Sequence, residues 1–418
     1  GLLFGYDTGV INGSLKFVQL KFDLTPAMKG FAASSALLAC IFGAAFAGAL
    51  SDRLGRKKTL ILSAILFLVS AIGTALSQNL TQFVIYRIIG GLGVGAASIT
   101  SPMYIAEISP AHIRGRMVSV NQLAIVMGML VVYFVNYYIA GLGDETWNIE
   151  TGWRWMFGSE SIPAVLLLVL LFFVPESPRW LAKQGRKDKA FEILANVDGQ
   201  QHAEKEMEAI EKTLFHESGS LSQLFHPGMR LLLVIGVTLA VLQQVTGINV
   251  FLYFGSEIFE KLGSESMDAA RLQQVVVGAT NLLFTVIALW TVDRLGRKPL
   301  LLIGSVGMGI ALFAMGTAGY LQKTGVWLLP FVLIYIASFA LSVGPVVWVV
   351  LSEIFPTKIR GRAMGIATIC LWVANSVVSQ TFPIMDENEM LVAKFHHGFP
   401  FFFFFMMCVV MFIFVAIV

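Results

Sequence analysis

Charged side chains are scarce in this sequence. It contains 29 Lys or Arg and 26 Asp or Glu residues, which together make up 13% of its 418 residues, whereas soluble globular proteins carry about 25%. Hydrophobic residues make up 56% of the chain, and the mean hydropathy is +0.76. This deficit of charge excludes a cytosolic enzyme, a disordered chain and a nucleic-acid-binding protein, and it indicates that lipid surrounds most of the chain.

Cysteine is also rare, and nucleotide-binding and metal-binding motifs are absent from the sequence. Cys40, Cys370 and Cys408 lie far apart in apolar runs, so we expect neither a disulfide framework nor a cysteine metal site. The histidines lack metal-ligand spacing within one helix, and the G-x-x-x-x-G-K-[ST] pattern of ATP-binding loops does not occur. No nucleophile–base pair stands out either. We therefore expect no cofactor, no metal and no enzymatic activity.

Long uncharged runs, in contrast, are abundant. A membrane-spanning helix needs about 20 mostly apolar residues. Ten such runs without Asp, Glu, Lys or Arg cover residues 30–51, 59–86, 88–106, 117–143, 231–256, 272–292, 299–322, 324–352, 363–385 and 395–418. Two more spans, 1–15 and about 155–175, are interrupted by Asp7 and Glu160. The sequence thus predicts an all-α membrane protein with twelve transmembrane helices.

A polar stretch at 176–230 divides these spans into two sets of six. It contains two segments without Gly or Pro, Lys187–Ala195 and Ala203–Leu214, whose apolar positions predict short surface helices. We therefore expect a six-helix half at 1–175, a helical linker at 176–229 and a second six-helix half at 230–418. Lys and Arg are concentrated in the linker and in the loops on the same side. This bias predicts a protein of the cell (inner) membrane whose linker and both termini face the cytoplasm.

Two short motifs recur at matching places in the two halves. The sequence DRLGRK at 52–57 is repeated at 293–298, and an E-I-x-P turn followed by I-R-G-R at 107–116 is repeated at 353–362. Both copies fall in loops on the side predicted to be cytoplasmic. A duplicated six-helix unit of parallel topology is one of the repeat types of secondary transporters.

These repeats and three other motifs resemble the sugar porters of the major facilitator superfamily. The other motifs are Gly5-Tyr6-Asp7, PESPRWL at 175–181 and QQVTGIN at 243–249, so the resemblance covers the whole chain. It implies secondary active transport of a monosaccharide, a pentose such as D-xylose or a hexose, by alternating access. It also implies a sugar site near the bilayer midplane between the halves.

Two charges inside apolar spans are candidates for proton coupling. An ion within a span is costly and is usually paired or faces a cavity. Asp7 is the obvious counter-ion of Arg87, and protonation of Asp7 would loosen the pair and let the helices shift. The alternative is a static structural pair. The resemblance favours proton symport, because this Asp marks proton-coupled members of the family. We place Glu160 in the same group and expect it to pair with the cytoplasmic charges.

Uncharged polar side chains within the spans are candidates for sugar binding, because carboxamides both donate and accept hydrogen bonds, as hydroxyls do. These amides are Gln122, Gln243, Gln244, Asn249 and Asn281. Hydrogen bonds between helices are the alternative role for each amide. Gly247 offers a place for the helix to unwind and turn Asn249 inward.

The resemblance assigns further sugar contacts and an inner gate. Phe4, Tyr253, Gly344, Trp348 and Trp372 match sugar-contact positions. Leu371 and Met129 stand where a xylose-transporting member of the family has glutamines, so the sugar itself is left open. The residues matching the cytoplasmic gate are Arg56, Glu107, Arg114, Glu176, Arg179, Arg297, Glu353 and Arg360, whose ion pairs between the halves would close the cytoplasmic side.

Two other functions fit the same fold. A facilitative sugar uniporter would use the Asp7–Arg87 pair structurally, and a non-transporting sugar sensor would bind without moving its ligand. The expected partners are a small sugar, protons and the lipid bilayer, with no nucleic acid, and the chain is expected to act as a monomer.

Overall fold

The computed structural model describes residues 1–110, 112–216, 226–261, 267–355 and 360–418, and these ranges form helices and loops without a strand. Eleven of the described helical segments are long and apolar enough to cross a membrane. The helix α1 (Leu2–Phe22) is the remaining long one, and its buried polar residues Asp7 and Asn12 lower its hydropathy. The predicted all-α architecture of twelve membrane helices is confirmed.

The helices before the linker pack together as one group, which we call the N-terminal group. It consists of α1, α2 (Pro26–Leu54), α3 (Arg56–Leu76), α4 (Leu80–Ile108), α5 (Arg114–Ala140) and a broken sixth span formed by α6 (Glu145–Trp147), η1 (Asn148–Gly152), α7 (Trp153–Ser159) and α8 (Ser161–Phe173). Within this group α4 packs on α2 and α3, and α1 packs on α5.

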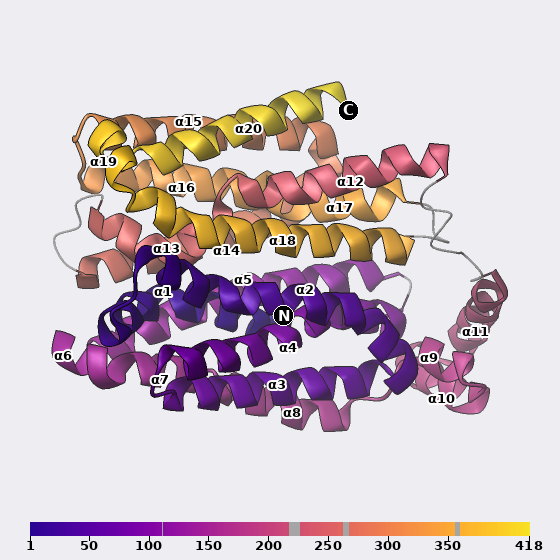
Figure 1. The fold of residues 1–418 in the computed structure, drawn as a ribbon. Coiled ribbons are helices and arrows are strands. Elements are labelled where there is room, and N and C mark those ends of the chain that lie inside the picture. The colour runs from indigo at the N-terminus through magenta and orange to yellow at the C-terminus, as the bar shows by residue number, and fades with distance from the viewer. Residues whose placement is uncertain (111, 217–225, 262–266, 356–359) are drawn as a thin grey trace.

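The helices after the linker form the C-terminal group. It consists of α12 (Pro227–Val245), α13 (Ile248–Lys261), α14 (Met267–Leu295), α15 (Arg297–Tyr320), η3 (Val326–Leu328), α16 (Leu329–Ser338), η4 (Phe339–Val343), α17 (Gly344–Ile354), α18 (Arg360–Asp386), α19 (Glu389–Phe395) and α20 (Phe399–Ile417). Figure 1 shows the two groups lying against each other, with α2 facing α18, α5 facing α14 and α1 facing α13 across the seam.

Local sequence explains where these helices begin. Thr25 caps α2 by accepting a hydrogen bond from the backbone N–H of Met28, and Pro26 is its first residue. Asn79 caps α4 in the same way through the N–H of Gln82. Between these caps the apolar runs are helical because a backbone in lipid must satisfy its own hydrogen bonds.

Three short helices lie at one end of the bundle, which we call the linker end (Figure 1). They are α9 (Pro178–Lys183), α10 (Lys187–Asp198) and α11 (Gln200–His216). The structure confirms the two predicted linker helices as α10 and α11, which share an apolar cluster around Leu194 and Ile210. The other end of the bundle, where α2 begins and α18 ends, is called the opposite end below.

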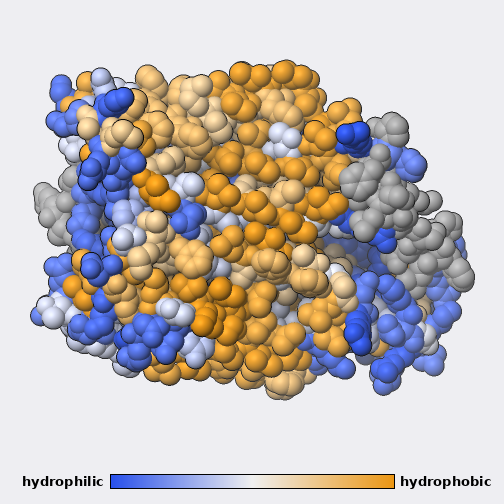
Figure 2. Space-filling model, viewed as in Figure 1, coloured by the Kyte–Doolittle hydropathy of each residue, from blue (hydrophilic) through white to orange (hydrophobic). Residues whose placement is uncertain are grey.

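The outer surface carries the apolar side chains that the composition requires. Figure 2 shows a hydrophobic band across the middle of the molecule, with hydrophilic residues gathered toward the two ends. Large apolar residues such as Phe46, Phe173 and Trp290 are exposed on this surface. Such a belt is what a lipid-embedded bundle presents to acyl chains.

Candidate functional site

The central feature of the N-terminal group is a buried ion pair between α1 and α4. Arg87 Nη1 donates a hydrogen bond of 2.6 Å to Asp7 Oδ1, and both side chains are less than 7% exposed. The guanidinium also lies 5.5 Å from the ring centroid of Phe157. The predicted pairing of the two charges is therefore present, and it joins helices that are 80 residues apart in the chain.

Glu160 lies at the junction of α7 and α8 and is only 1% exposed. It interacts electrostatically with Asp7 and Arg87. Neither of its carboxylate oxygens has a hydrogen-bond partner among the described residues by distance criteria. The expected pairing of Glu160 with the cytoplasmic charges is thus wrong, because its charged neighbours are the buried pair itself.

A small cavity of about 10 Å³ lies beside this ion pair, which is close to the space needed for one water molecule. Asp7, Thr8 and Arg87 line it from the N-terminal group, and Tyr253 and Trp372 line it from the C-terminal group. The Nε atom of Arg87 is buried and has no partner among the described residues. The cavity therefore places a free guanidinium donor next to two of the predicted sugar contacts.

The predicted sugar-binding amides at the α12–α13 junction form a chain of hydrogen bonds. Asn249 donates to Gln244 Oε1, and Gln244 donates to Gln243 Oε1 at 3.2 Å. Gln243 Nε2 in turn donates to the main-chain oxygens of Val343 at 3.0 Å and Gly344 at 2.9 Å. Four of the predicted sugar-site residues are thus brought together, with three amides held in fixed orientations.

A break in the helix makes this arrangement possible. The α-helical hydrogen-bonding stops at Val245 and resumes at Ile248, with Gly247 at φ +96° between them. A Cβ atom on Gly247 would lie 2.7 Å from the ring of Phe404, so a side chain is excluded by both conformation and space. The predicted unwinding at Gly247 is present.

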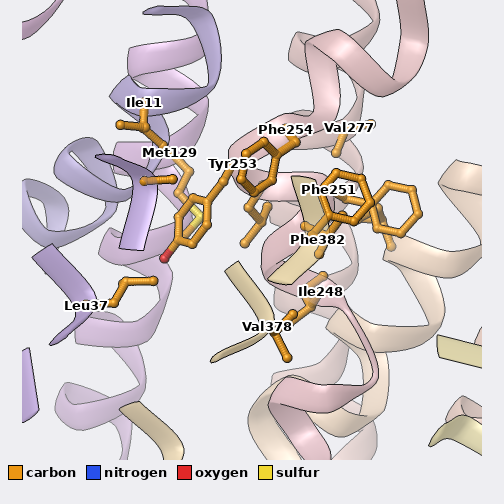
Figure 3. Close-up of a cluster of buried hydrophobic side chains, with 14 of the residues drawn as sticks. Ile11, Leu37, Met129, Ile248, Phe251, Tyr253, Phe254, Val277, Val378 and Phe382 are labelled. Carbon is orange, nitrogen blue, oxygen red and sulfur yellow. The ribbon is translucent and has the colours of Figure 1, made fainter. Parts of the chain in front are cut away.

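Aromatic side chains from both groups meet next to the ion pair. Figure 3 shows Tyr253 extending from α13 toward Leu37 and Met129 of the N-terminal group. Phe4 and Trp372 pack edge to face across the groups, with ring centroids 5.9 Å apart. The indole Nε1 of Trp372 is buried and has no partner among the described residues. A sugar hydroxyl is the kind of acceptor that this donor lacks.

The other predicted sugar residues lie in neighbouring helices without described side-chain hydrogen bonds. Gln122 is in α5, Asn281 in α14 and Trp348 in α17. The described contacts do not join them to the amide chain. Met129 and Leu371 are both buried, at 7% and 5% exposure, so their apolar side chains form part of the interior between the groups.

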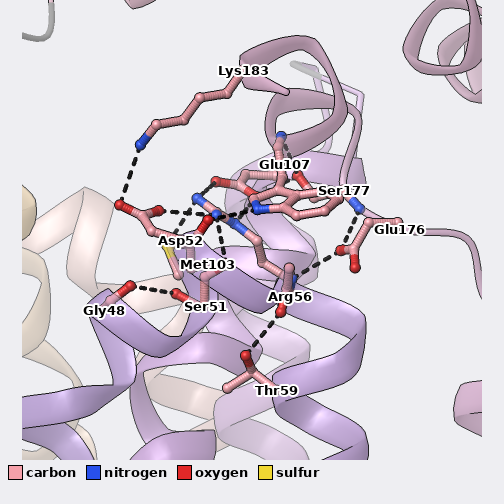
Figure 4. Close-up of polar contacts among 12 residues, drawn as sticks. Gly48, Ser51, Asp52, Arg56, Thr59, Met103, Glu107, Glu176, Ser177 and Lys183 are labelled. Atoms are coloured by element: carbon pink, nitrogen blue, oxygen red, sulfur yellow. Dashed lines mark hydrogen bonds and ion pairs between the residues drawn. The ribbon is translucent and has the colours of Figure 1, made fainter. Parts of the chain in front are cut away.

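At the linker end, the first copy of the repeated motif forms a compact charge cluster (Figure 4). Arg56 donates to both oxygens of Glu107 at 2.8 and 2.9 Å, a bidentate pair that is almost fully buried. Glu176 accepts from the backbone N–H groups of Arg56 and Lys57 at 2.9 and 3.0 Å. The Glu176 carboxylate thereby caps the start of α3, where a negative charge is favoured by the helix dipole.

Two further arginines among the gate candidates have described partners outside this cluster. Arg297 pairs with Glu353 at 2.7 Å in the second repeat, and this pair is much more exposed than its counterpart. Arg114 pairs at 2.5 Å with Glu206 of α11, a partner that the sequence did not suggest. Arg179 lies in α9, and the side chain of Arg360 falls outside the described residues. These pairs lie within one group or join it to the linker.

Sequence reasoning missed an amide that joins the groups. Asn12 of α1 donates to the main-chain oxygen of Leu252 at 2.8 Å and accepts from the hydroxyl of Ser256 at 2.6 Å. Tyr133 of α5 also donates to Leu252 O at 3.3 Å. The signal was available, because Asn12 is a polar residue within the first apolar span.

Comparisons with known proteins agree with this geometry. The profile of a family described as "Sugar (and other) transporter" matches residues 1–418. The chain is 47% identical to the D-xylose-proton symporter of Escherichia coli (strain K12), an alignment that covers 97% of this chain and 88% of the relative. It is 43% identical to the arabinose-proton symporter of Bacillus subtilis (strain 168) over 94% of this chain and 85% of that protein.

Among solved structures, a partially occluded, inward-open form of the E. coli xylose transporter matches with a TM-score of 0.88 and 44% identity. This match covers 100% of this chain and 96% of the solved one. The relative that the motifs suggested, the bacterial D-xylose–proton symporter, is therefore among the proteins most similar to this chain. The relatives of this chain are transporters rather than enzymes, and the chain belongs to the sugar transporter family of the major facilitator superfamily.

Proposed function

We propose that the protein is a secondary active transporter that moves a monosaccharide together with a proton. The observation that carries this proposal is the buried Asp7–Arg87 pair, which shares a water-sized cavity with Tyr253 and Trp372. A proton site and a sugar site that share one cavity can influence each other directly. The names of the xylose-proton and arabinose-proton symporters support the same conclusion.

The proton's role follows from the cost of buried charge. Asp7 and Glu160 share the single guanidinium of Arg87, so one proton on a carboxylate makes the cluster neutral. In our proposal, protonation of Asp7 removes its ionic hold on Arg87, and α1 is then free to move relative to α4. Loss of the proton on the other side of the membrane restores the pair.

The sugar's role falls to the amide chain and the aromatic rings. Gln243, Gln244 and Asn249 present donors and acceptors that have fixed directions, and the ring of Trp372 offers a surface for the apolar face of a pyranose. Leu371 and Met129 add apolar surface to this region. We propose a pentose or hexose as the substrate.

Alternating access requires two bodies that rock against each other. We propose that residues 1–175 and 230–418 are these bodies and that 176–229 is the connecting unit. The protein lies in an inner membrane with its linker end facing the cytoplasm, as the basic loops indicate. One chain suffices for transport. The ion pair of Lys16 with Glu260 and the hydrogen bonds of Asn12 join the groups near the opposite end, so the opposite end is closed in this conformation.

The test is uptake of labelled xylose and glucose into proteoliposomes, with and without an inward proton gradient. We expect the wild type to accumulate sugar above equilibrium in the gradient. Asp7→Asn is expected to keep exchange but to lose accumulation, because the pair can no longer be switched by a proton. Asp23→Asn, an exposed change at the end of the same helix, is the matched control and should leave both activities intact.

Other outcomes separate the alternatives. If wild type and Asp7→Asn both only equilibrate sugar, whatever the gradient, the protein is a uniporter and the ion pair is structural. If the purified protein binds sugar but moves none, it is a sensor.

A further inference from the structure

A buried lysine crosses the seam between the two groups at the opposite end. Lys29 lies in the second turn of α2 and is only 3% exposed, although lysine is among the residues least often buried. Its ammonium group pairs with Glu257 of α13 and lies 3.5 Å from Glu387, just beyond the end of α18. The cation thus belongs to the N-terminal group and both of its acidic neighbours to the C-terminal group.

The acidic partners depend on this cation. The side chain of Glu257 is only 13% exposed, and its second oxygen, Oε1, is buried without a partner among the described residues. Glu387 is more open, at 27%. Moving the groups apart at this end would separate Lys29 from both acids. Lys29 can therefore neutralise Glu257 only while the two groups stay in contact at this end.

Most nearby charges are paired with one another, although Lys261 of α13 also interacts electrostatically with Glu257 and Glu387. Asp386 pairs with Lys261 and with His397, all within the C-terminal group. Lys16 of α1 pairs with Glu260 of α13 at 2.7 Å, also across the seam, but these side chains are 24% and 39% exposed. Among the described residues, Lys29 and Lys16 of the N-terminal group thus make one buried and one more hydrated ion pair across the seam at this end.

Polar contacts between α2 and α18 lie on either side of Lys29 in the chain. Gln380 of α18 donates to the main-chain oxygen of Ala27 at 3.0 Å and accepts from the hydroxyl of Ser34 at 2.9 Å. A Cβ atom on Gly30 would lie 2.5 Å from the main-chain oxygen of Gln380. The two helices are therefore in close contact just before and just after Lys29 in the chain, which holds this turn of α2 beside the C-terminal group, where Lys29 pairs with Glu257.

We propose that Lys29 is a gating residue: its buried pairing with Glu257 and Glu387 holds the opposite end closed, and breaking that pairing is a required step each time this end opens. The proposal rests on the alternating-access function proposed above. Lys29 acts by positioning helices and not by touching sugar. Removing the lysine leaves Glu257 and Glu387 close together in the closed state, with Lys261, which already pairs with Asp386, as their remaining described cationic neighbour. Losing the direct partner of a buried charge is unfavourable. In the open state both acids gain water.

The test measures distances between spin labels in lipid nanodiscs, in a background whose three native cysteines are replaced. Labels at Leu142 and Met390, exposed positions on the two groups at the opposite end, report opening there. Labels at Leu54 and Leu295, also exposed, report the linker end. We expect Lys29→Met to raise the ratio of open to closed molecules at the opposite end more than tenfold, with closure at the linker end.

The matched control is Lys16→Met, which removes a lysine from the exposed pair across the same seam. Exposed pairs contribute little, so this ratio should change less than about threefold. Lys29→Arg should retain the wild-type distribution. In the double variant Lys29→Met, Glu257→Gln the shift should be smaller than in Lys29→Met alone, because removing both partners leaves less unpaired charge.

Equal shifts for Lys29→Met and Lys16→Met, or no shift for either, would overturn the gating role, and so would a double variant with fully additive effects. The distance measurement does not depend on whether any sugar is transported. If the wild type fails to transport any sugar while the distances change as expected, the proposed symport falls and the gate stands. If transport succeeds and the distances do not change, the gate falls alone.

Discussion

At the scale of single residues, Trp372 offers a hydrogen-bond donor to a sugar. Its indole N–H is buried without a partner among the described residues, and burying such a donor is unfavourable unless a ligand accepts its hydrogen bond. We expect Trp372→Phe to keep the ring surface and lose the donor, which should raise the KM for sugar uptake about two- to tenfold, since a hydrogen bond contributes roughly 0.5–1.5 kcal/mol.

Proteoliposome uptake over a range of sugar concentrations measures this change. Trp290→Phe is the control, because Trp290 is exposed on the lipid-facing surface and should leave KM unchanged. If Trp372→Phe leaves KM unchanged as well, the indole N–H does not contact the sugar.

Which single residues could be predicted depended on where they stand in the chain. Asp7 and Arg87 interrupt apolar runs, so their mutual need for a counter-ion was evident from the sequence. Lys29 stands at the edge of a span, where a charge looks ordinary, and its partner Glu257 is 228 residues away. Its burial results from the packing of α2 on α18, and no local pattern encodes that packing.

At the scale of helices, breaks were predictable only where glycine marks them. Gly247 marked the α12–α13 break in the sequence. The π-helical turn η4 (Phe339–Val343), which contains the acceptor oxygen of Val343, was missed although Gly344 and Pro345 follow it directly. The short helix α19 (Glu389–Phe395) was also missed, because it is only seven residues long and lies between two spans.

The connection through α19 creates a pH-sensitive contact between α18 and α20. The Nδ1–H group of His397 donates to the main-chain oxygen of Asp386 at 2.9 Å and lies 3.3 Å from its carboxylate. The hydrogen bond to the Asp386 carboxylate raises the pKa of His397 above its usual value, even though partial burial and Lys261 act to lower it. The charged imidazole is therefore bound more tightly in the folded protein than in the unfolded chain.

This raised pKa fixes the sign of a pH effect on stability. The contribution of His397 is fully present below the unfolded pKa of about 6.5 and is lost as the pH rises through the higher folded pKa. We expect His397→Asn to lower the apparent melting temperature most near pH 5.5 and least near pH 9. Thermal unfolding in detergent across this range measures the difference.

The control for this effect repeats the change in an Asp386→Asn background, where the carboxylate partner is gone. There the pH-dependent part of the difference should disappear. A difference of constant size across the whole pH range in the wild-type background would show that the ionised histidine adds no stability.

At the scale of the whole molecule, the two repeats have diverged in their surroundings. Glu107 pairs with Arg56 in a nearly buried site and also accepts from Ser177 of the linker. The corresponding pair, Glu353 with Arg297, is largely exposed. We therefore expect equivalent positions in the two halves to contribute unequally to stability, because a described linker residue, Ser177, contacts the first of these pairs.

The same substitution in both repeats tests this inequality. Glu107→Gln should lower the free energy of unfolding by about 2–4 kcal/mol, since it leaves a buried guanidinium without its counter-ion. Glu353→Gln should lower it by less than about 1 kcal/mol. Apparent melting temperatures of the purified variants measure the ranking, and equal losses at the two sites would contradict it.

Most of the architecture was accessible from the sequence, because lipid imposes long apolar helices and the repeated motifs locate both halves. The amide chain around Gln243 was partly accessible through the residue types. What could not be read from the sequence is the conformational state, because it depends on contacts between helices of different groups. Asn12 with Ser256 is one such contact, made across 244 residues.

The hydrogen bonds of Gln243 have a consequence for how such a site changes over evolutionary time. Its amide is anchored on two main-chain oxygens, those of Val343 and Gly344, and every amino acid supplies a main-chain oxygen. Mutational drift in the side chain at 343 can therefore proceed without removing the acceptor. The direction of the Gln243 amide is therefore conserved by the backbone rather than by the identity of a partner side chain.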